Sequence, residues 1–361
     1  MIMEIDIIKV VLPAVVAFIV GIGITPVITR YLYSHEMWKK KAKSVALGGG
    51  DTPVFNQLHG EKKEVGTPRL GGMVIWLSVL IITLAFWLLG HLFGDTIFAK
   101  LDFLSRDQTW IPLVVLLFGA LVGFVDDVLE IKGSGGNYAG GLSLKKRLVL
   151  VAAIAGFVAW WFFTKLDVAS VHVPFLGEPY LGWFFIPVFI LIVLFIYSGG
   201  VIDGLDGLSG GVFASIFGAY AVIAFFQNQI NLAAFCAVVV GAILAFLWFN
   251  IPPARFYMSE TGSMALTITI AVVAFMTDTL GEGRGIAVLP VIALPLVVTT
   301  CSVIIQVASK KLRAGKKVFR IAPLHHHFEA IGWPAYKVVM RYWIVSIIAA
   351  TFGVILALFK I

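Results

Sequence analysis

The chain has 361 residues, of which 60% are hydrophobic and 13% are charged, with a mean hydropathy of +0.98 and a formal net charge of +7. This composition excludes an average soluble domain and predicts a membrane protein. Apolar runs long enough to cross a bilayer recur along the whole length, so we expect one integral-membrane domain over residues 1–361 and no nucleic-acid partner.

About ten apolar segments have the length that the hydrocarbon core requires of a helix. The fold class predicted is therefore an all-α polytopic membrane protein. The segments centre near Val16, Ile81, Val115, Ala155, Leu191, Ala219, Val239, Ala271, Leu294 and Ala349. Ten spans place both termini on one side of the membrane. On the opposite side lie the connectors 31–70, 126–147, 199–209, 251–261 and 309–337.

Basic residues indicate which side these five connectors face. About 20 of the 27 Lys and Arg residues fall in them or at their edges, notably in 39–43 and 310–320. The positive-inside rule then makes this side cytoplasmic. The charge there has two interpretations, attraction of anionic lipid headgroups or attraction of a phosphorylated substrate.

The polar motifs also gather on the predicted cytoplasmic side. They are Asp126-Asp127, Asp203 with Asp206, the segment 250–260 and His325-His326-His327. A transporter would instead place charges near the middle of the bilayer and show matched broken helices in two repeats. Neither feature is evident, so the sequence predicts one cytoplasmic-facing active-site cleft.

The stretch 198–211 places two carboxylates among glycines, between the apolar runs 184–197 and 212–226. Acidic groups at the edge of the hydrocarbon are costly and mark functional sites by default. If the stretch is helical, its three-residue spacing puts Asp203 and Asp206 on one face. The alternative is a polar loop that uses Asp and Gly only as turn residues.

Asp126 and Asp127 follow an apolar helix and precede a Gly-rich loop with Lys145-Lys146-Arg147. Adjacent residues do not share a helix face, so at most one of the two is expected to bind a metal ion directly. With Asp203, Asp206 and Glu260 they form an oxygen-rich set that suits Mg²⁺ bridging to substrate phosphates. A simple pair at a helix C-terminus is the alternative, although like charges there are disfavoured.

Two further motifs point to a nucleotide. In the segment 250–263, Phe256 and Tyr257 are candidates to stack on a base and Arg255 to meet a phosphate, although interfacial aromatics are common in membrane proteins. Consecutive histidines point in different directions, which disfavours a three-His zinc site at 325–327. We expect these histidines to bind phosphate or transfer protons, unless the loop is merely solvated.

Together these motifs resemble the phospho-N-acetylmuramoyl-pentapeptide transferases, within the polyprenyl-phosphate N-acetylhexosamine-1-phosphate transferases. The resemblance covers nearly the whole chain. It rests on Thr67-Pro68-Arg69-Leu70-Gly71-Gly72, Asp126-Asp127, residues 203–208, residues 246–250, and residues 323–329 with Gly332-Trp333. The histidine motif favours the muramoyl-pentapeptide branch, whereas Pro68 to Gly72 looks more like the N-acetylglucosamine or teichoic-acid branch.

The resemblance implies ten membrane helices, a cytoplasmic active site in the bacterial inner membrane, and Mg²⁺ dependence. It implies transfer of phospho-MurNAc-pentapeptide from UDP-MurNAc-pentapeptide to undecaprenyl phosphate, which gives lipid I and UMP. The partners implied are these two substrates and membrane lipids, and apolar helix faces allow a homodimer. Breaking the diphosphate requires charge neutralisation at the leaving UMP and at the attacking phosphate oxygen.

Roles carry over from the family onto matching positions. Asp126 would be the base or the acid that faces the lipid phosphate, with Asp127 beside it, and Glu260 stands where the family has a metal-binding Asp. Asp203 and Asp206 would line the nucleotide side. The remaining positions implied are metal binding by Asp126, Asp127 and Glu260, catalysis by His325, and substrate binding by Thr67, Arg147, Gly204, Leu205, Asn250, Tyr257, His326 and His327.

Four positions depart from the family pattern. Gly200 replaces an Asn, Ser259-Glu260 replaces Gly-Asp, Arg147 replaces a Lys and Thr299 replaces a Glu. A Glu carries its carboxylate one methylene further, so the metal geometry must shift or Glu260 must bind through water. The competing functions are a related transferase with another UDP-N-acetylhexosamine donor, a polytopic lipid transporter, and a catalytically silent scaffold.

Overall fold

The computed structural model describes residues 2–39, 66–94, 96–134, 141–173, 176–278, 280–281 and 283–359. These residues form 13 α-helices and no strand; two isolated β-bridges join Ser170 to Tyr180 and Val173 to Gly177. The helices are α1 (Ile2–Ser34), α3 (Met73–Leu92), α4 (Ile97–Leu101), α5 (Trp110–Ile131), α6 (Leu144–Lys165), α7 (Phe185–Ser198), α8 (Leu208–Phe226), α9 (Ile230–Asn250), α10 (Ser259–Met276), α11 (Gly285–Ile292), α12 (Leu294–Leu312), α13 (Leu324–Ala330) and α14 (Ala335–Leu358).

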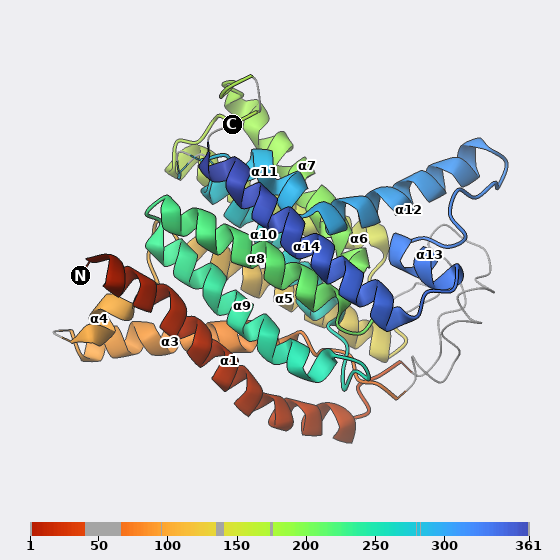
Figure 1. The fold of residues 1–361 in the computed structure, drawn as a ribbon, viewed down its shortest axis with the longest axis horizontal. Helices are drawn as coiled ribbons and strands as arrows, with labels where there is room; N and C mark the ends of the chain where they lie inside the picture. Colours follow the sequence, from red (N-terminus) through yellow and green to blue (C-terminus); the bar gives the residue numbers. More distant parts are fainter. Residues whose placement is uncertain are drawn as a thin grey trace.

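Ten of these segments are long and apolar enough to cross a membrane, which confirms the predicted all-α polytopic class. Figure 1 shows the long helices as one bundle, with both termini toward one end and α13 toward the other. That arrangement agrees with an even number of spans. Lys40, Lys41, Lys43, Lys62 and Lys63 of the predicted basic connector lie outside the described residues.

Helix α10 lies at the centre of the bundle. Every residue from Thr261 to Met276 is buried, because α3, α5, α7, α8 and α11 all pack against this helix. Helix α5 approaches most closely at Gly123, where an added Cβ would collide with the backbone carbonyl of Glu260. Only a glycine lets the two backbones pass at this distance. The start of α10 is therefore held directly against the carboxyl half of α5, which carries Asp126 and Asp127.

The predicted ninth span, centred at Leu294, is not continuous. Helix α11 ends at Ile292, α12 starts at Leu294, and Pro295 follows the break. Proline cannot supply a backbone N–H and clashes with the preceding turn, so it favours a new helix start at this point. The spanning helix is α12 itself, which leaves the bundle beside α13 (Figure 1).

At the end opposite α13, Asp278 joins a loop to α11. Its carboxylate is buried, with 2% of the residue exposed, and accepts hydrogen bonds from the backbone N–H groups of His172 (2.9 Å) and Ile286 (3.1 Å). Burial raises the pKa of Asp278 to about 6, the two backbone bonds lower it, and the charge of Glu178 raises it. This carboxylate therefore joins the segment after α6 to the start of α11.

Asp278 is expected to make the protein less stable as the pH rises from 5 to 7. The pKa of Asp278 is about 6 in the folded state, against 3.8 for an unperturbed carboxyl. The folded state therefore binds the proton more tightly than the unfolded state. The stability that this contributes is fully present below pH 4 and is lost as the pH rises through 6. Between pH 5 and pH 7 the loss is about 1.4 kcal/mol, or roughly 2 °C in Tm. Melting temperatures in detergent should show this pH dependence reduced in Asp278→Asn but unchanged in Asp107→Asn, an exposed control. An unchanged pH dependence in Asp278→Asn would contradict the assignment.

Candidate active site

Asp126 and Asp127 point in different directions from α5, as expected for neighbours on a helix. Asp127 is fully buried and faces the start of α10. Its Oδ2 accepts from the backbone N–H (2.9 Å) and the hydroxyl (2.6 Å) of Thr261, and its Oδ1 accepts from the backbone N–H of Glu260 (3.3 Å). A carboxylate satisfies the unpaired N–H groups of a helix N-terminus and opposes its positive dipole. Asp127 therefore fixes the position of Glu260.

Arg69 completes the surroundings of Asp127. Its guanidinium lies 3.4 Å from Asp127 Oδ1 and 2.8 Å from Glu130 Oε2, and Lys39 Nζ lies 2.7 Å from the other oxygen of Glu130. Burial alone would lower the pKa of Arg69, but the charges of Glu130 and Asp127 outweigh it and raise the pKa above the usual range. This guanidinium stays charged and compensates two buried acids.

Sequence reasoning gave no site role to Arg69, Glu130, Lys39 or Thr261. One signal was present, because Asp127 and Glu130 are three residues apart and share a helix face that needs a cation. The identity of that cation was not accessible, since Arg69 is 58 residues from Asp127 in the chain.

Asp126 meets a second arginine. One nitrogen of Arg147, Nη1, lies 2.5 Å from Glu260 Oε1 and 3.6 Å from Asp126 Oδ2, and Asp126 Oδ1 accepts from the backbone N–H of Leu142 (2.5 Å). Three predicted site residues from α5, α6 and α10 are thus brought together. Two carboxylates share one guanidinium, which is the arrangement expected of a site that handles anionic groups.

Asp203 reaches the same cluster through the backbone of α10. Its Oδ2 accepts from the N–H of Ser259 (2.9 Å) and its Oδ1 from the hydroxyl of Ser209 (2.7 Å). Burial raises the pKa of Asp203, and these two hydrogen bonds lower it part of the way back. Ser259 holds a left-handed φ of 57°, a conformation that would cost less for a glycine.

Residues 203–207 are not helical, so the condition under which Asp203 and Asp206 would share a helix face is not met. The 3₁₀ turn Gly199–Ile202 ends before Asp203, and Gly207 has a φ of 79°, so residues 203–207 form a loop. Asp206 contacts the loop between α9 and α10, where it accepts from the N–H of Ala254 (3.2 Å). The glycines of this stretch bend the backbone out of the helix.

Asn250 joins these two loops. Its Oδ1 accepts from the N–H of Gly207 (2.9 Å), and its Nδ2 donates to the carbonyl of Phe256 (2.8 Å). The predicted stacking of Phe256 on a base is wrong, because its ring is fully buried between Phe246 and Phe249. Tyr257 is half-buried, and its stacking on a base remains a prediction.

The segment that contains Thr67 lies beside Tyr257. The N–H of Tyr257 donates to the carbonyl of Pro68 (2.8 Å), and the N–H of Gly71 donates to the carbonyl of Tyr257 (2.8 Å). Thr67, the residue before Pro68, is half-buried. This backbone pairing places Arg69 beside Asp127. The 67–72 motif thus positions a cation for a buried acid, a role that its sequence alone did not reveal.

The histidines of α13 meet the loop of Asp203. A Cβ on Gly204 would collide with His325 Nε2 and would lie 2.9 Å from His326 Nε2, so both rings lie directly against this exposed glycine. Leu205, also expected to bind substrate, is 9% exposed. His326 Nδ1 lies 2.8 Å from Glu329 Oε2, while His327 turns away and accepts from the N–H of Arg320 (3.1 Å). Burial, with the charge of Arg320, lowers the pKa of His327.

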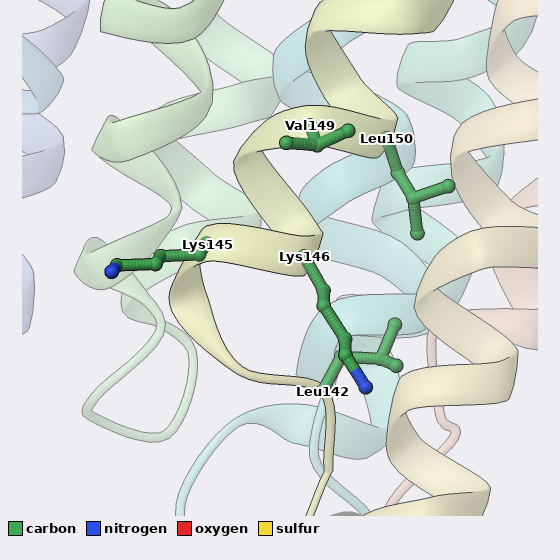
Figure 2. A pocket seen from close by; sticks show the side chains of 5 residues that line it. All are labelled: Leu142, Lys145, Lys146, Val149 and Leu150. Carbon is green, nitrogen blue, oxygen red and sulfur yellow. The ribbon is translucent and has the colours of Figure 1, made fainter.

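A groove of about 360 Å³ opens beside Asp126 at the start of α6 (Figure 2). Its lining consists of Leu142, Lys145, Lys146, Val149 and Leu150. Lys145 and Lys146 point to different sides of the first turn, with Lys146 on the side of Leu150 (Figure 2). Because Leu142 both lines the groove and donates to Asp126, the groove reaches the acidic cluster on the side of Leu142.

The donor set suits Mg²⁺ in its chemistry, since it offers only carboxylate oxygens. Within the described ranges, no three acidic, His or Cys side chains stand close enough together to hold a metal ion. Asp126 and Glu260 meet at one atom of Arg147, whereas both oxygens of Asp127 already accept protein hydrogen bonds. Two carboxylates with water and substrate phosphates fit the way Mg²⁺ is usually bound.

Comparison with known proteins gives consistent results. Residues 109–278, from α5 to the end of α10, match the model of glycosyl transferase family 4. Three bacterial relatives carry the name phospho-N-acetylmuramoyl-pentapeptide-transferase. The one from Chloroflexus aurantiacus is 34% identical over 334 residues, which are 89% of this chain and 84% of the relative.

Two further relatives with this name cover similar shares of the chain. The protein of Geobacillus thermodenitrificans is 37% identical over 301 residues, which are 81% of this chain and 84% of the relative. That of Bacillus thuringiensis is 35% identical over 349 residues, which are 94% and 95% of the two chains. With this coverage, and with the acidic and histidine motifs gathered at one end of the bundle, the chain belongs to the phospho-N-acetylmuramoyl-pentapeptide-transferase family.

Proposed function

We propose that the protein transfers phospho-MurNAc-pentapeptide from UDP-MurNAc-pentapeptide to undecaprenyl phosphate, with lipid I and UMP as products. An oxygen of the lipid phosphate attacks the sugar-bearing phosphorus, a new diphosphate bond forms, and the bond to the UMP phosphate breaks. The observation that carries the proposal is the cluster of Asp126, Arg147 and Glu260. Ser259, which directly precedes Glu260, also joins this cluster to Asp203.

The residues divide the work by position. The groove beside Asp126 would receive the lipid, with Lys146 facing its phosphate and Val149 and Leu150 facing its chain. His325 and His326, against Gly204, would face the donor. Arg147 would neutralise phosphate charge as it develops in the transition state.

Asp126 and Glu260 are the residues we propose to hold Mg²⁺. When bound, the ion would neutralise charge on the diphosphate and stabilise the leaving UMP. The longer side chain of Glu260 reaches the same guanidinium as Asp126, so the extra methylene does not remove its carboxylate from the cluster. Asp127 supports this pair by holding the start of α10.

We also propose the bacterial cytoplasmic membrane as the location, with the α13 end of the bundle in the cytoplasm. The basic residues 310–320 lie at that end, as the positive-inside rule requires. A homodimer through apolar helix faces remains a prediction.

The second candidate is a relative that uses another UDP-N-acetylhexosamine donor. The observation that favours it is the 67–72 motif, which resembles that branch and packs directly against Tyr257. In that case the same fold and cluster would act on a donor without the peptide.

The test is UMP release by purified protein with undecaprenyl phosphate and either UDP-MurNAc-pentapeptide or UDP-GlcNAc, with and without Mg²⁺. We expect release with the first donor only, and a loss of at least about 100-fold when Mg²⁺ is chelated. Release with UDP-GlcNAc alone would establish the second candidate. A Glu260→Ala variant that kept full Mg²⁺-dependent turnover would contradict the metal assignment.

A further inference from the structure

Helix α12 has an inverted distribution of polar residues. Its outward side carries exposed Ile304, Ile305 and Val307, while its buried side carries polar residues at helical spacing. These are Thr299, Ser302, Gln306 and Ser309. A helix with its apolar face outward suits contact with lipid, so the polar face must find its partners within the protein.

The buried polar face binds the loop between α12 and α13. Gln306 accepts from the N–H groups of Val318 and Phe319 (both 3.0 Å) and donates to the carbonyl of Phe319 (2.8 Å). The hydroxyl of Ser309 donates to the carbonyl of Lys316 (2.9 Å), and that of Ser302 accepts from the N–H of Leu324 (3.0 Å). These bonds run from Ser302 to Leu324, so α12, the following loop and the start of α13 form one hydrogen-bonded unit.

This unit carries a concentrated positive charge. Glu329 is the one acidic residue between Gly283 and Ile361 in the sequence, and its carboxylate already meets His326. No acid within the described ranges forms an ion pair with the exposed or half-exposed basic residues of this region. They are Lys310, Lys311, Arg313, Lys316, Lys317, Arg320, Lys337 and Arg341.

We name Lys310, Lys311, Arg313, Lys316 and Lys317 the basic tip. Leu312, in its middle, is 81% exposed. Cations on both sides of an exposed leucine, at the end of a lipid-facing helix, are typical of a segment at the level of the lipid headgroups. A soluble nucleotide would satisfy the cations but would leave the apolar side chain of Leu312 in water, whereas a lipid bilayer accommodates both.

We propose that the basic tip binds anionic phospholipid headgroups of the surrounding bilayer, and that this contact holds His325 and His326 against Gly204. Five neighbouring cations repel one another until anions lie between them, and the hydrogen bonds of Gln306 and Ser309 transmit the position of the tip to α13. Anionic lipid then activates the enzyme from outside the substrate site. The effect on turnover rests on the proposed function, whereas the binding itself does not.

The experiment uses the full-length protein in nanodiscs of phosphatidylcholine with 0 or about 30% phosphatidylglycerol. We expect UMP release to rise about fivefold with the anionic lipid at low salt, and less at high salt because exposed charges are screened. The triple variant Lys311→Gln, Lys316→Gln, Lys317→Gln should lose this rise. A matched variant with Lys100→Gln, Arg106→Gln and Lys165→Gln, which are all exposed and lie outside the five connectors predicted to be cytoplasmic, should keep it.

Hydrogen exchange separates this inference from the proposed function. Amides of α13 should exchange about fivefold more slowly in the anionic nanodiscs, in wild type and not in the tip variant. Slower exchange without turnover on either UDP donor would support the lipid contact and contradict the proposed function. If neither hydrogen exchange in α13 nor UMP release differed between neutral and anionic nanodiscs, the inference would be overturned. So would a tip variant whose only defect is a raised KM for the UDP donor in both lipids.

Discussion

Replacing Asp127 with asparagine is expected to lower UMP release at least about 100-fold and to destabilise the protein by about 3 kcal/mol. Asp127 is 0% exposed, and its two oxygens accept from the backbone of Glu260, the backbone and hydroxyl of Thr261, and Arg69. An asparagine amide would turn one of these acceptors into a donor that faces other donors. It would also leave the Arg69 guanidinium with one acid fewer.

The loss of turnover follows from the position of Glu260. Because the N–H of Glu260 donates to Asp127, a relaxed start of α10 moves the carboxylate that meets Arg147. The measurements are UMP release and Tm in detergent, with Asp107→Asn as an exposed carboxylate control. Wild-type turnover and Tm in the Asp127→Asn protein would show that Asp127 has no anchoring role.

The ten spans and the identity of the acidic motif were predictable from sequence, because apolar length and buried charge are local properties. The break in the ninth span was not. The run from Gly285 to Ala308 is nearly all apolar, and the prediction centred the span on the prolines that interrupt it. The spaced polar residues Thr299, Ser302, Gln306 and Ser309 were the available signal for α12. The partners of Gln306 and Ser309 lie in the following loop, and that of Ser302 is the first residue of α13.

The limits at the site have the same origin. Residue spacing predicted that Asp126 and Asp127 diverge, but not that Asp127 would face an α-helix N-terminus 134 residues further along the chain. The three-residue spacing of Asp203 and Asp206 was uninformative because Gly207 adopts a positive φ. Phe256 was indistinguishable from a stacking residue until its neighbours Phe246 and Phe249 were known. Patterns within one element were reliable, and pairings between elements required the fold.

The second large effect is expected at Arg147. Replacing it with glutamine should lower turnover by about 1,000-fold, since a charge placed for the transition state is lost. In the structure this one side chain separates the carboxylates of Asp126 and Glu260, at 3.6 Å and 2.5 Å. Without it the two acids repel one another and the bound phosphates lose a positively charged partner.

Lysine provides the matched comparison for Arg147, because it keeps the positive charge and is the residue that the resemblance implies at this position. The ammonium group keeps the charge but lies at the end of a flexible stem, so it is held less firmly between the two carboxylates than the planar guanidinium. We therefore expect Arg147→Lys to lose about tenfold in turnover, against about 1,000-fold for Arg147→Gln. Both variants should keep the wild-type Tm to within a few degrees, since the side chain is partly exposed. Equal losses in the two variants would mean that the shape of the guanidinium, and not its charge, is what the reaction requires.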